Sequence, residues 1–213
     1  MAEYQLYCFA QSGNSYKAAL ALALTGADWE PIWVDFFNGG VRTPEYRAIN
    51  VMGEAPVLVH GDVTLSQSGV ILDYLSQRYR EIAPGSEAER REVLRWLLWD
   101  NHKLTSYIAT LRWMKNFLPA EKREPAVLAF LDGRARAAMK VLDGHLAGRD
   151  WIAADKLTIA DLSCVGYLYF TDEFDVDIAA YPNIGRWRDA IAALPGWKHP
   201  YELMPGHPLP APA

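Results

Sequence analysis

Short apolar segments alternate with helical patterns over the first part of the chain. Tyr4–Phe9 and Trp29–Val34 have the composition of β-strands. Between them, an Ala- and Leu-rich stretch predicts a helix from Ser15 to Thr25 that Gly26 ends, and Gln11–Asn14 predicts a turn before it. A strand, a turn and a helix in this order are typical of an α/β unit.

A short helix and a β-hairpin come next. Thr43-Pro44 is favoured at the start of a helix. Val57–His60 and Val63–Leu65 are β-rich segments separated by a tight turn, which predicts an antiparallel pair. Ser66 can cap the helix that follows, whose apolar positions continue at helical spacing to about Tyr79.

The predicted order β-α-β-α-β-β-α over residues 1–82 gives way to helical patterns alone. Arg80–Gly85 predicts a linker, and Ser86–Glu89 is a capping box. Helices are predicted over residues 86–117, Pro125–Leu146 and Pro182–Leu194. We therefore expect an all-helical domain at 86–204 and an extended, mobile Pro-rich tail at 205–213.

The long helix ending at Phe117 is apolar on two sides, which predicts burial between elements or a position lining a pocket. One side carries Val93, Leu97, Leu104, Ile108 and Leu111, and the other carries Trp96, Trp99, Tyr107 and Met114. Further along, Thr158 and Asp161 have the spacing of a capping box. That helix start can form inside a core.

Composition narrows the function classes. The chain of 213 residues has 51% hydrophobic residues and a net charge of −5, from 21 basic and 26 acidic residues. These values are typical of a folded globular protein, and a nucleic-acid surface is not expected because it needs concentrated positive charge. No apolar run reaches the length of a membrane span and the first residues lack a signal-peptide pattern, so we expect a cytoplasmic protein.

Cysteines and histidines give no redox or metal motif. Cys8 and Cys164 are the two cysteines, without a Cys-x-x-Cys motif, so any redox chemistry needs a borrowed thiol. The five histidines show no metal-ligand spacing, and no glycine-rich phosphate loop is present. Neither a metal nor a nucleotide is expected.

Five segments together resemble a cytosolic glutathione transferase, of the bacterial type with a serine at the active site. They are Leu6-Tyr7, Ser12–Lys17, Glu54–Pro56, Leu65–Ser68 and Leu157–Asp161. The resemblance implies an N-terminal thioredoxin-like domain that binds glutathione, an all-helical C-terminal domain that supplies the electrophile pocket, and a homodimer.

Ser12 and Asn14 are the residues we expect to act on the glutathione sulfur. The helix that begins near Asn14 or Ser15 presents free N–H groups with partial positive charge, which favours a thiolate. A hydroxyl that donates to a charged group contributes a further ~1.5–3 kcal/mol. The resemblance places the Ser12 hydroxyl at the sulfur, with Asn14 assisting. Ser15 remains a rival, and a plain turn with an N-cap is the structural alternative.

Gln67 and Ser68 begin a helix after the hairpin, where a hydroxyl and free N–H groups form an anion site. The resemblance assigns this pair to the γ-glutamyl carboxylate of glutathione. The commoner family residue at position 67 is Glu, so Gln67 lacks a negative charge for the glutathione amine. Asp100, acting across the dimer interface, is a candidate for that role, and an ordinary helix carboxylate is the alternative.

Ala55-Pro56 precedes the third strand. Sequence alone predicts a trans bond, whereas the resemblance implies a cis-proline that directs the Ala55 backbone to the glutathione cysteine. Glu54 departs from the family pattern, and we expect its side chain to point to solvent. Arg42 is one possibility for the glycyl carboxylate, which stays unassigned.

On the long helix, Tyr107 and Leu111 are the candidates for the electrophile pocket, and a position in the core or at the dimer interface is the alternative for the side that carries Tyr107. The resemblance makes Asp161 structural. The favoured function is conjugation of glutathione to an apolar electrophile. A glutathione-dependent disulfide or peroxide reductase, or a non-catalytic interaction protein on the same fold, are the alternatives.

Overall fold

The computed structural model describes residues 2–207, which form two compact units. One unit contains the residues up to Ala83 and those from Leu194 onward, and the other spans Pro84–Ala193. The last part of the expected helical domain, residues 194–204, therefore belongs with the first unit. Of the expected tail, residues 205–207 are described, and the rest lies outside the described residues.

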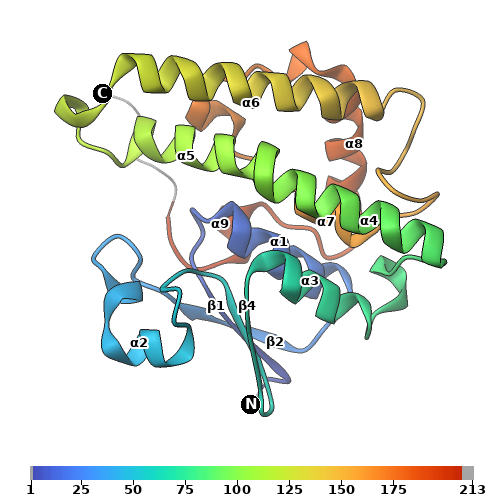
Figure 1. Ribbon diagram of the computed structural model, residues 1–213. Helices are drawn as coiled ribbons and strands as arrows, with labels where there is room; N and C mark the ends of the chain where they lie inside the picture. The colour runs from blue at the N-terminus through green and yellow to red at the C-terminus, as the bar shows by residue number, and fades with distance from the viewer. Residues whose placement is uncertain (1, 208–213) are drawn as a thin grey trace. The chain divides into compact units, whose positions relative to one another are not determined.

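A four-stranded mixed sheet forms the centre of the first unit (Figure 1). In spatial order its strands are β2 (Trp29–Trp33), β1 (Tyr4–Cys8), β3 (Val57–His60) and β4 (Val63–Ser66). Strand β1 is parallel to β2 and antiparallel to β3, and β3 and β4 form the predicted hairpin. The predicted α/β order is confirmed, because every strand agrees with its predicted limits to within one residue.

Helix α1 (Gly13–Leu24) joins β1 to β2, α2 (Pro44–Ile49) joins β2 to β3, and α3 (Ser68–Ser76) follows β4. Helices α1 and α3 lie side by side (Figure 1). The segment Ala18–Leu22 of α1 is fully buried, because its small and apolar side chains pack in the core of this unit. The start of each helix is thereby fixed relative to the other.

The chain returns to the first unit at its C-terminal end. A Cβ at Gly196 would lie 2.6 Å from the carbonyl oxygen of Ala23, so the backbone approaches α1 as closely as only glycine allows. The Tyr16 hydroxyl donates to the carbonyl of Lys198 at 3.0 Å. A short helix, α9 (Pro200–Leu203), follows. These contacts explain why residues 194–204 belong to the first unit. No periodic pattern in the sequence predicted the contacts.

The second unit consists of helices. They are α4 (Glu87–Trp99), α5 (Thr105–Asn116), α6 (Pro125–His145), α7 (Ile159–Val165) and α8 (Pro182–Ala192). All five residues of the first predicted apolar face of the long helix are buried. On the second face, Trp96 is buried and packs edge-on against Trp99 with ring centroids 5.0 Å apart, so part of that face is also core.

The predicted unbroken helix to Phe117 contains a π-helical segment, Asp100–Leu104, between α4 and α5. The Thr105 hydroxyl donates to Asp100 Oδ1 at 2.8 Å, and the Ser163 hydroxyl donates to Oδ2 at 2.6 Å. A π-segment widens the helix by one residue per turn, which sequence periodicity does not reveal. Here it coincides with a buried carboxylate that ties α4, α5 and α7 together.

Thr158 and Asp161 form the predicted capping box at the start of α7. Asp161 Oδ2 accepts from the Thr158 N–H at 2.8 Å, while Oδ1 accepts from the Ile152 N–H at 2.9 Å and from the Trp187 indole at 3.0 Å. Burial raises the pKa of Asp161 to about 6 even though these donors favour the carboxylate. Asp161 is therefore a structural residue of the helical unit.

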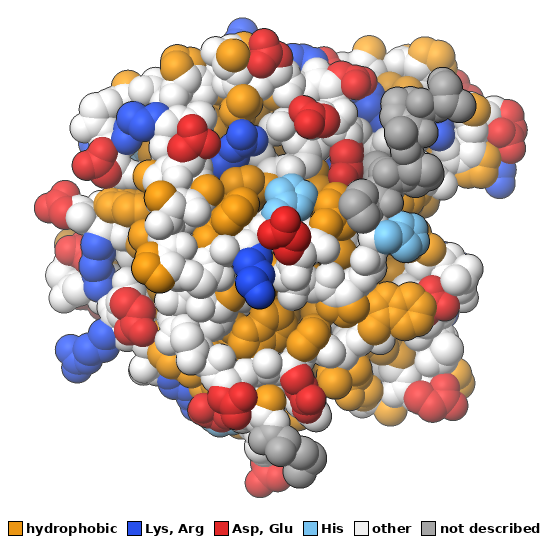
Figure 2. Space-filling view, turned by 180° about the vertical axis from the view of Figure 1, so that it is seen from behind, with side chains coloured by type: hydrophobic (Ala, Val, Ile, Leu, Met, Phe, Trp, Pro, Cys, Tyr) orange, Lys and Arg blue, Asp and Glu red, His pale blue; other side chains and the backbone are white. Residues whose placement is uncertain are grey.

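Charged side chains of both signs are interspersed on the face shown in Figure 2, without a continuous basic region. No helix among the described residues is long and apolar enough to cross a membrane. Within residues 2–207, no group of His, Cys, Asp and Glu side chains is placed to hold a metal ion.

Candidate active site

The start of α1 presents Ser12. This residue is the N-cap of the helix, and its Oγ accepts a hydrogen bond from the Ser15 N–H at 3.0 Å. The helix therefore begins two residues earlier than predicted. A hydroxyl that accepts through its oxygen keeps its hydrogen available, so Ser12 can donate to a ligand at the positive end of the helix dipole.

Ser15, the rival candidate, lies deeper. Its side chain has no exposed surface, and its Oγ has no hydrogen-bond partner within the described part of the chain. Ser12 is 6% exposed. A ligand sulfur can therefore reach Ser12 with less rearrangement than Ser15, although both hydroxyls stand at the same helix end.

Asn14 and Ser68 connect the starts of the two neighbouring helices. The Ser68 hydroxyl donates to Asn14 Oδ1 at 3.4 Å. Because the Asn14 oxygen faces Ser68, its amide nitrogen is the atom left for a ligand. The structure thus brings together two residues that are far apart in the sequence and that were both predicted to contact glutathione.

Gln67 occupies the N-cap of α3 with φ of 69°, a left-handed conformation that is uncommon for a non-glycine residue. The predicted cap, Ser66, is instead the last residue of β4. Ser68 is the first helical residue and is buried. The first N–H groups of α3 and the Ser68 hydroxyl make this helix start suitable for a carboxylate.

The Ala55-Pro56 peptide bond is cis, as the resemblance implied and sequence alone did not. The carbonyl of the preceding residue, Glu54, accepts from the Tyr46 hydroxyl at 3.0 Å and from the Asn50 amide at 2.8 Å. Helix α2 and the residue after it therefore hold this loop in place beside β3.

Glu54 was expected to point to solvent, and that expectation is incomplete. Its side chain is exposed, but its Oε2 accepts a hydrogen bond from the Gln67 amide nitrogen at 3.0 Å. The same amide nitrogen lies 3.1 Å from the sulfur of Met52. The carboxylate is therefore directed toward the start of α3, because the side-chain amide of Gln67 donates to it.

The C-terminal segment lies beside Ser12, which sequence reasoning missed. The Ala10 N–H donates to the Pro205 carbonyl at 2.8 Å, and the Gln11 side-chain amide donates to the His207 carbonyl at 2.8 Å. The proline-rich composition indicated an extended segment but gave no indication of its partner. Residues 205–207 thus brace the turn that leads into α1.

Asp100, the candidate for a role across the dimer interface, is a buried helix carboxylate in this structure. It has no exposed surface, and its two oxygens accept from Thr105 and Ser163 of its own chain. Arg42, the possibility for the glycyl carboxylate, is exposed in a short 3-10 helix, Gly40–Arg42. No contact in the described residues assigns it a ligand role.

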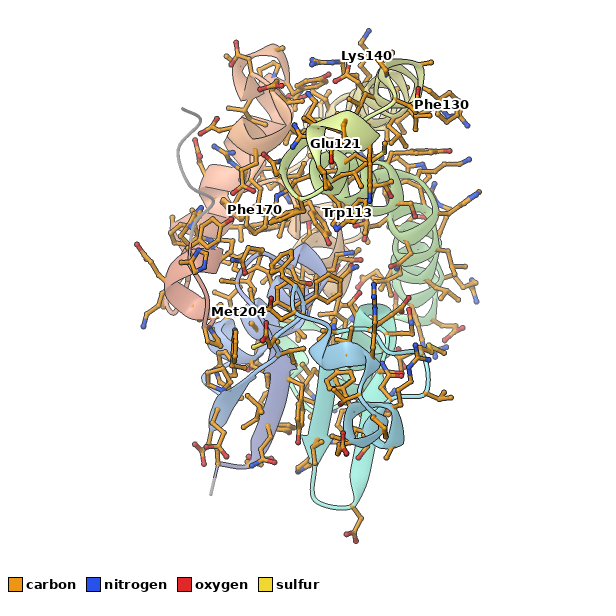
Figure 3. All side chains as sticks on the ribbon, turned by 90° about the vertical axis from the view of Figure 1, so that its left-hand side faces the viewer. Trp113, Glu121, Phe130, Lys140, Phe170 and Met204 are labelled. Carbon is orange, nitrogen blue, oxygen red and sulfur yellow. The ribbon has the colours of Figure 1, made fainter. Side chains whose placement is uncertain are left out.

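The two residues predicted for the electrophile pocket differ from each other. Leu111 has no exposed surface, as expected of a core residue. Tyr107 is partly exposed, and its hydroxyl accepts from Arg134 of α6 at 3.2 Å. The Arg134 guanidinium lies 5.3 Å from the Tyr107 ring and 5.8 Å from that of Phe130, which is 59% exposed on α6 (Figure 3). Tyr107 is therefore engaged in the contact between α5 and α6.

Comparisons with known proteins agree with this architecture. The family model for the glutathione S-transferase N-terminal domain matches residues 2–77 of this chain, and the family model for the C-terminal domain matches residues 103–195. A maleylacetoacetate isomerase of Pseudomonas aeruginosa is 31% identical over 92% of this chain and 95% of its own length. Glutathione S-transferase 3 of Zea mays is 29% identical over 99% of each chain.

More distant and structural relatives extend the comparison. A disulfide-bond oxidoreductase of Escherichia coli is 25% identical over 88% of this chain and 89% of its own. The crystal structure of a glutathione S-transferase from Xanthobacter autotrophicus superimposes with a TM-score of 0.84, is 34% identical, and covers 92% of this chain and 95% of that one. The chain therefore belongs to the glutathione S-transferase family of enzymes, with both of the family's domains.

Proposed function

We propose that the protein binds glutathione in its first unit, stabilises the thiolate with Ser12, and transfers it to an apolar electrophile. In this reaction the sulfur forms a bond to carbon, and the leaving group departs with the electron pair of the bond that breaks. The observation that carries the proposal is the hydrogen bond from the Ser15 N–H to Ser12 Oγ, which orients the hydroxyl and leaves its hydrogen for the sulfur.

The magnitudes are sufficient for this role. Lowering a thiol pKa from about 8.5 to about 6.5 requires about 2.7 kcal/mol of preference for the anion. A helix N-terminus supplies ~0.3–1 kcal/mol, which is too little alone. One hydroxyl that donates to the charged sulfur adds ~1.5–3 kcal/mol. Ser12 and the start of α1 together reach the required preference.

The remaining contacts suit the rest of glutathione. The γ-glutamyl carboxylate would bind at the start of α3 to Ser68 and to free backbone N–H groups. The cysteinyl backbone would lie along Ala55 beside the cis bond. Asn14 contacts Ser68, so its side-chain amide lies beside the place proposed for the γ-glutamyl carboxylate.

A second candidate function is isomerisation of an activated double bond, favoured by the 31% identity to a maleylacetoacetate isomerase. The same thiolate would add to the double bond, allow rotation about the resulting single bond, and leave again with its electron pair. Glutathione would be regenerated. The two candidates share Ser12 and differ in whether the product retains the sulfur.

Disulfide reduction is the third reading, suggested by the likeness to a disulfide-bond oxidoreductase. Cys8 is fully buried, and burial raises its pKa to about 12, so it supplies no reactive thiol. One glutathione thiolate would attack the disulfide, form a mixed disulfide and expel the first thiolate of the substrate. A second glutathione thiolate would attack the glutathione sulfur of that mixed disulfide, which gives oxidised glutathione and expels the second thiolate. A homodimer in the cytoplasm is part of the proposal in each case, and a non-catalytic interaction protein is the outcome if no turnover is found.

The test is to incubate the purified protein with glutathione and, in turn, a chlorodinitrobenzene, a cis-configured unsaturated dicarbonyl acid and a dialkyl disulfide. Mass spectrometry of the products separates the readings. A stable glutathione adduct that depends on Ser12 supports transfer. A trans product without sulfur supports isomerisation, and oxidised glutathione supports reduction. Binding of glutathione without any of these products would contradict the enzymatic proposals.

A further inference from the structure

None of the residues proposed to contact glutathione supplies an anion for its amine. The γ-glutamyl end of glutathione is a zwitterion, with an ammonium group and a carboxylate on the same carbon. The start of α3 suits the carboxylate. Gln67 carries no charge, and Asp100 is enclosed by hydroxyl donors of its own chain. An ammonium group placed beside Ser68 would therefore need another anion.

Glu54 is the carboxylate that the fold brings to this place. Its Oε2 lies 3.0 Å from the amide nitrogen of Gln67, whose backbone is the N-cap of α3. The carboxylate is therefore within one glutamine side chain of the helix start. Since the Gln67 nitrogen donates to Glu54, the other polar atom of that amide is an acceptor, as an ammonium group requires.

The position of Glu54 is set by buried groups, although its side chain is exposed. Its carbonyl accepts from Tyr46 and Asn50, which are 8% and 4% exposed. The side-chain oxygen of Asn50, Oδ1, in turn accepts from the Met52 N–H at 3.1 Å. These hydrogen bonds hold the backbone of the loop at Met52 and at Glu54, so the backbone position from which the Glu54 side chain extends is fixed.

Electrostatic repulsion disfavours a carboxylate beside bound glutathione unless that carboxylate contacts the ammonium group of the ligand. Activated glutathione carries two carboxylates and a thiolate, all of which a nearby acid repels, and one ammonium group, which it attracts. A carboxylate beside the γ-glutamyl site is favourable only if the amine lies next to it.

We propose that Glu54, oriented by Gln67, is the acceptor for the γ-glutamyl ammonium group of glutathione, and that it makes the site selective for ligands with this free amine. The inference rests on the proposed function, because it assigns one contact of the same ligand. In this assignment, the carboxylate of Glu54 takes the part for which Gln67 lacks a negative charge.

The test compares two ligands on the intact protein by titration calorimetry. One is glutathione, and the other is its glutaryl analogue, which lacks only the amine. The variants are Glu54→Gln, the charge-relocating pair Glu54→Gln with Gln67→Glu, and Glu81→Gln as a matched control, an exposed acid of the same unit. A general folding defect would weaken both ligands alike, so the ratio of the two affinities is the readout.

We expect Glu54→Gln to weaken glutathione binding about fivefold, the size of an exposed charge contact, and to leave the glutaryl analogue unchanged or bound more tightly. Adding Gln67→Glu should restore the preference for glutathione, and Glu81→Gln should change neither affinity. Equal effects of Glu54→Gln on both ligands, or unchanged or tighter binding of glutathione, would overturn the inference while leaving the proposed function intact. Absence of glutathione binding to the unmodified protein would overturn both.

Discussion

The Ser12 hydroxyl oxygen accepts a hydrogen bond from the backbone nitrogen of Ser15 at 3.0 Å. This contact serves the fold and the chemistry together. It satisfies one of the free N–H groups at the start of α1, and it fixes the hydroxyl at the helix end where negative charge is favoured. The two serines that sequence reasoning treated as rivals thus differ. The Ser15 backbone orients the Ser12 hydroxyl, and in the proposed function that hydroxyl donates to the ligand.

Ser15→Ala removes a hydroxyl that is buried without a partner in the described residues. We expect this variant to keep the proposed activity and to match the unmodified protein in stability or exceed it by up to ~1 kcal/mol, because a buried unsatisfied hydroxyl is destabilising. Urea unfolding and the rate of adduct formation measure both. A loss of activity in Ser15→Ala with Ser12→Ala unaffected would reverse the assignment.

Gly206→Ala should disturb the turn before Ser12. A Cβ at this position would lie 2.9 Å from Ala10 Cβ and 3.0 Å from Gln11 Oε1, and the backbone φ of +134° is strained for any side chain. We expect weaker glutathione binding, measured by calorimetry. Gly26→Ala is the matched control, because it also has a positive φ but no atom within 4 Å. Equal losses of affinity in both variants would refute a bracing role for residues 205–207.

Asp161→Ala should destabilise the helical unit by ~3 kcal/mol or more. It would strand the Ile152 N–H, the Trp187 indole and the Thr158 N–H in the core, and each unsatisfied donor costs ~1–3 kcal/mol. Thr158→Ser, which keeps the hydroxyl, should cost less than ~1 kcal/mol. Thermal melting and soluble yield provide the readout. An Asp161→Ala protein that melts like the original would show that the capping box is dispensable.

Cys8 should not react with thiol reagents in the folded protein. Burial raises its pKa to about 12, so it stays protonated where a free thiol ionises. Because the unfolded state then releases a proton that the folded state retains, the stability contributed by Cys8 is full below the unfolded pKa of about 8.5. It falls by ~1.4 kcal/mol per pH unit between that value and the folded pKa of about 12. Labelling with a disulfide reagent at pH 8, with and without urea, checks this. Rapid labelling without urea would contradict the burial argument.

Local patterns were enough to predict the sheet and most of the helices, because strand periodicity, the turn between β3 and β4, and the helix starts at Ser86 and Thr158 are local signals. The Ser86 hydroxyl caps α4, but Glu89 accepts from the Gly85 N–H and does not complete the predicted capping box. The π-segment at Asp100–Leu104 was missed, since one extra residue per turn leaves the helical composition unchanged. The return of residues 194–204 to the first unit was also missed. It depends on the approach of Gly196 to Ala23, a contact between residues far apart in the sequence.

For the candidate site, helix-start composition indicated the segments that contain Ser12 and Ser68, and the resemblance singled out the residues within them. Their mutual placement was beyond sequence reasoning. The contact of Ser68 with Asn14 and that of Gln67 with Glu54 join three separate segments of the first unit. Glu54 was expected to point to solvent, and its hydrogen bond to Gln67 was not predictable from the sequence.

An ultraviolet difference titration that follows the thiolate absorbance of bound glutathione against pH tests directly whether Ser12 stabilises the thiolate. Cys8 does not interfere, because its pKa is raised to about 12. We expect the bound thiol to ionise about two pH units below free glutathione in the unmodified protein and in Ser12→Thr. In Ser12→Ala the pKa should return toward the free value by at least about one unit. An unshifted thiol in the unmodified protein, or a shift that survives in Ser12→Ala, would contradict the claim that Ser12 stabilises the thiolate.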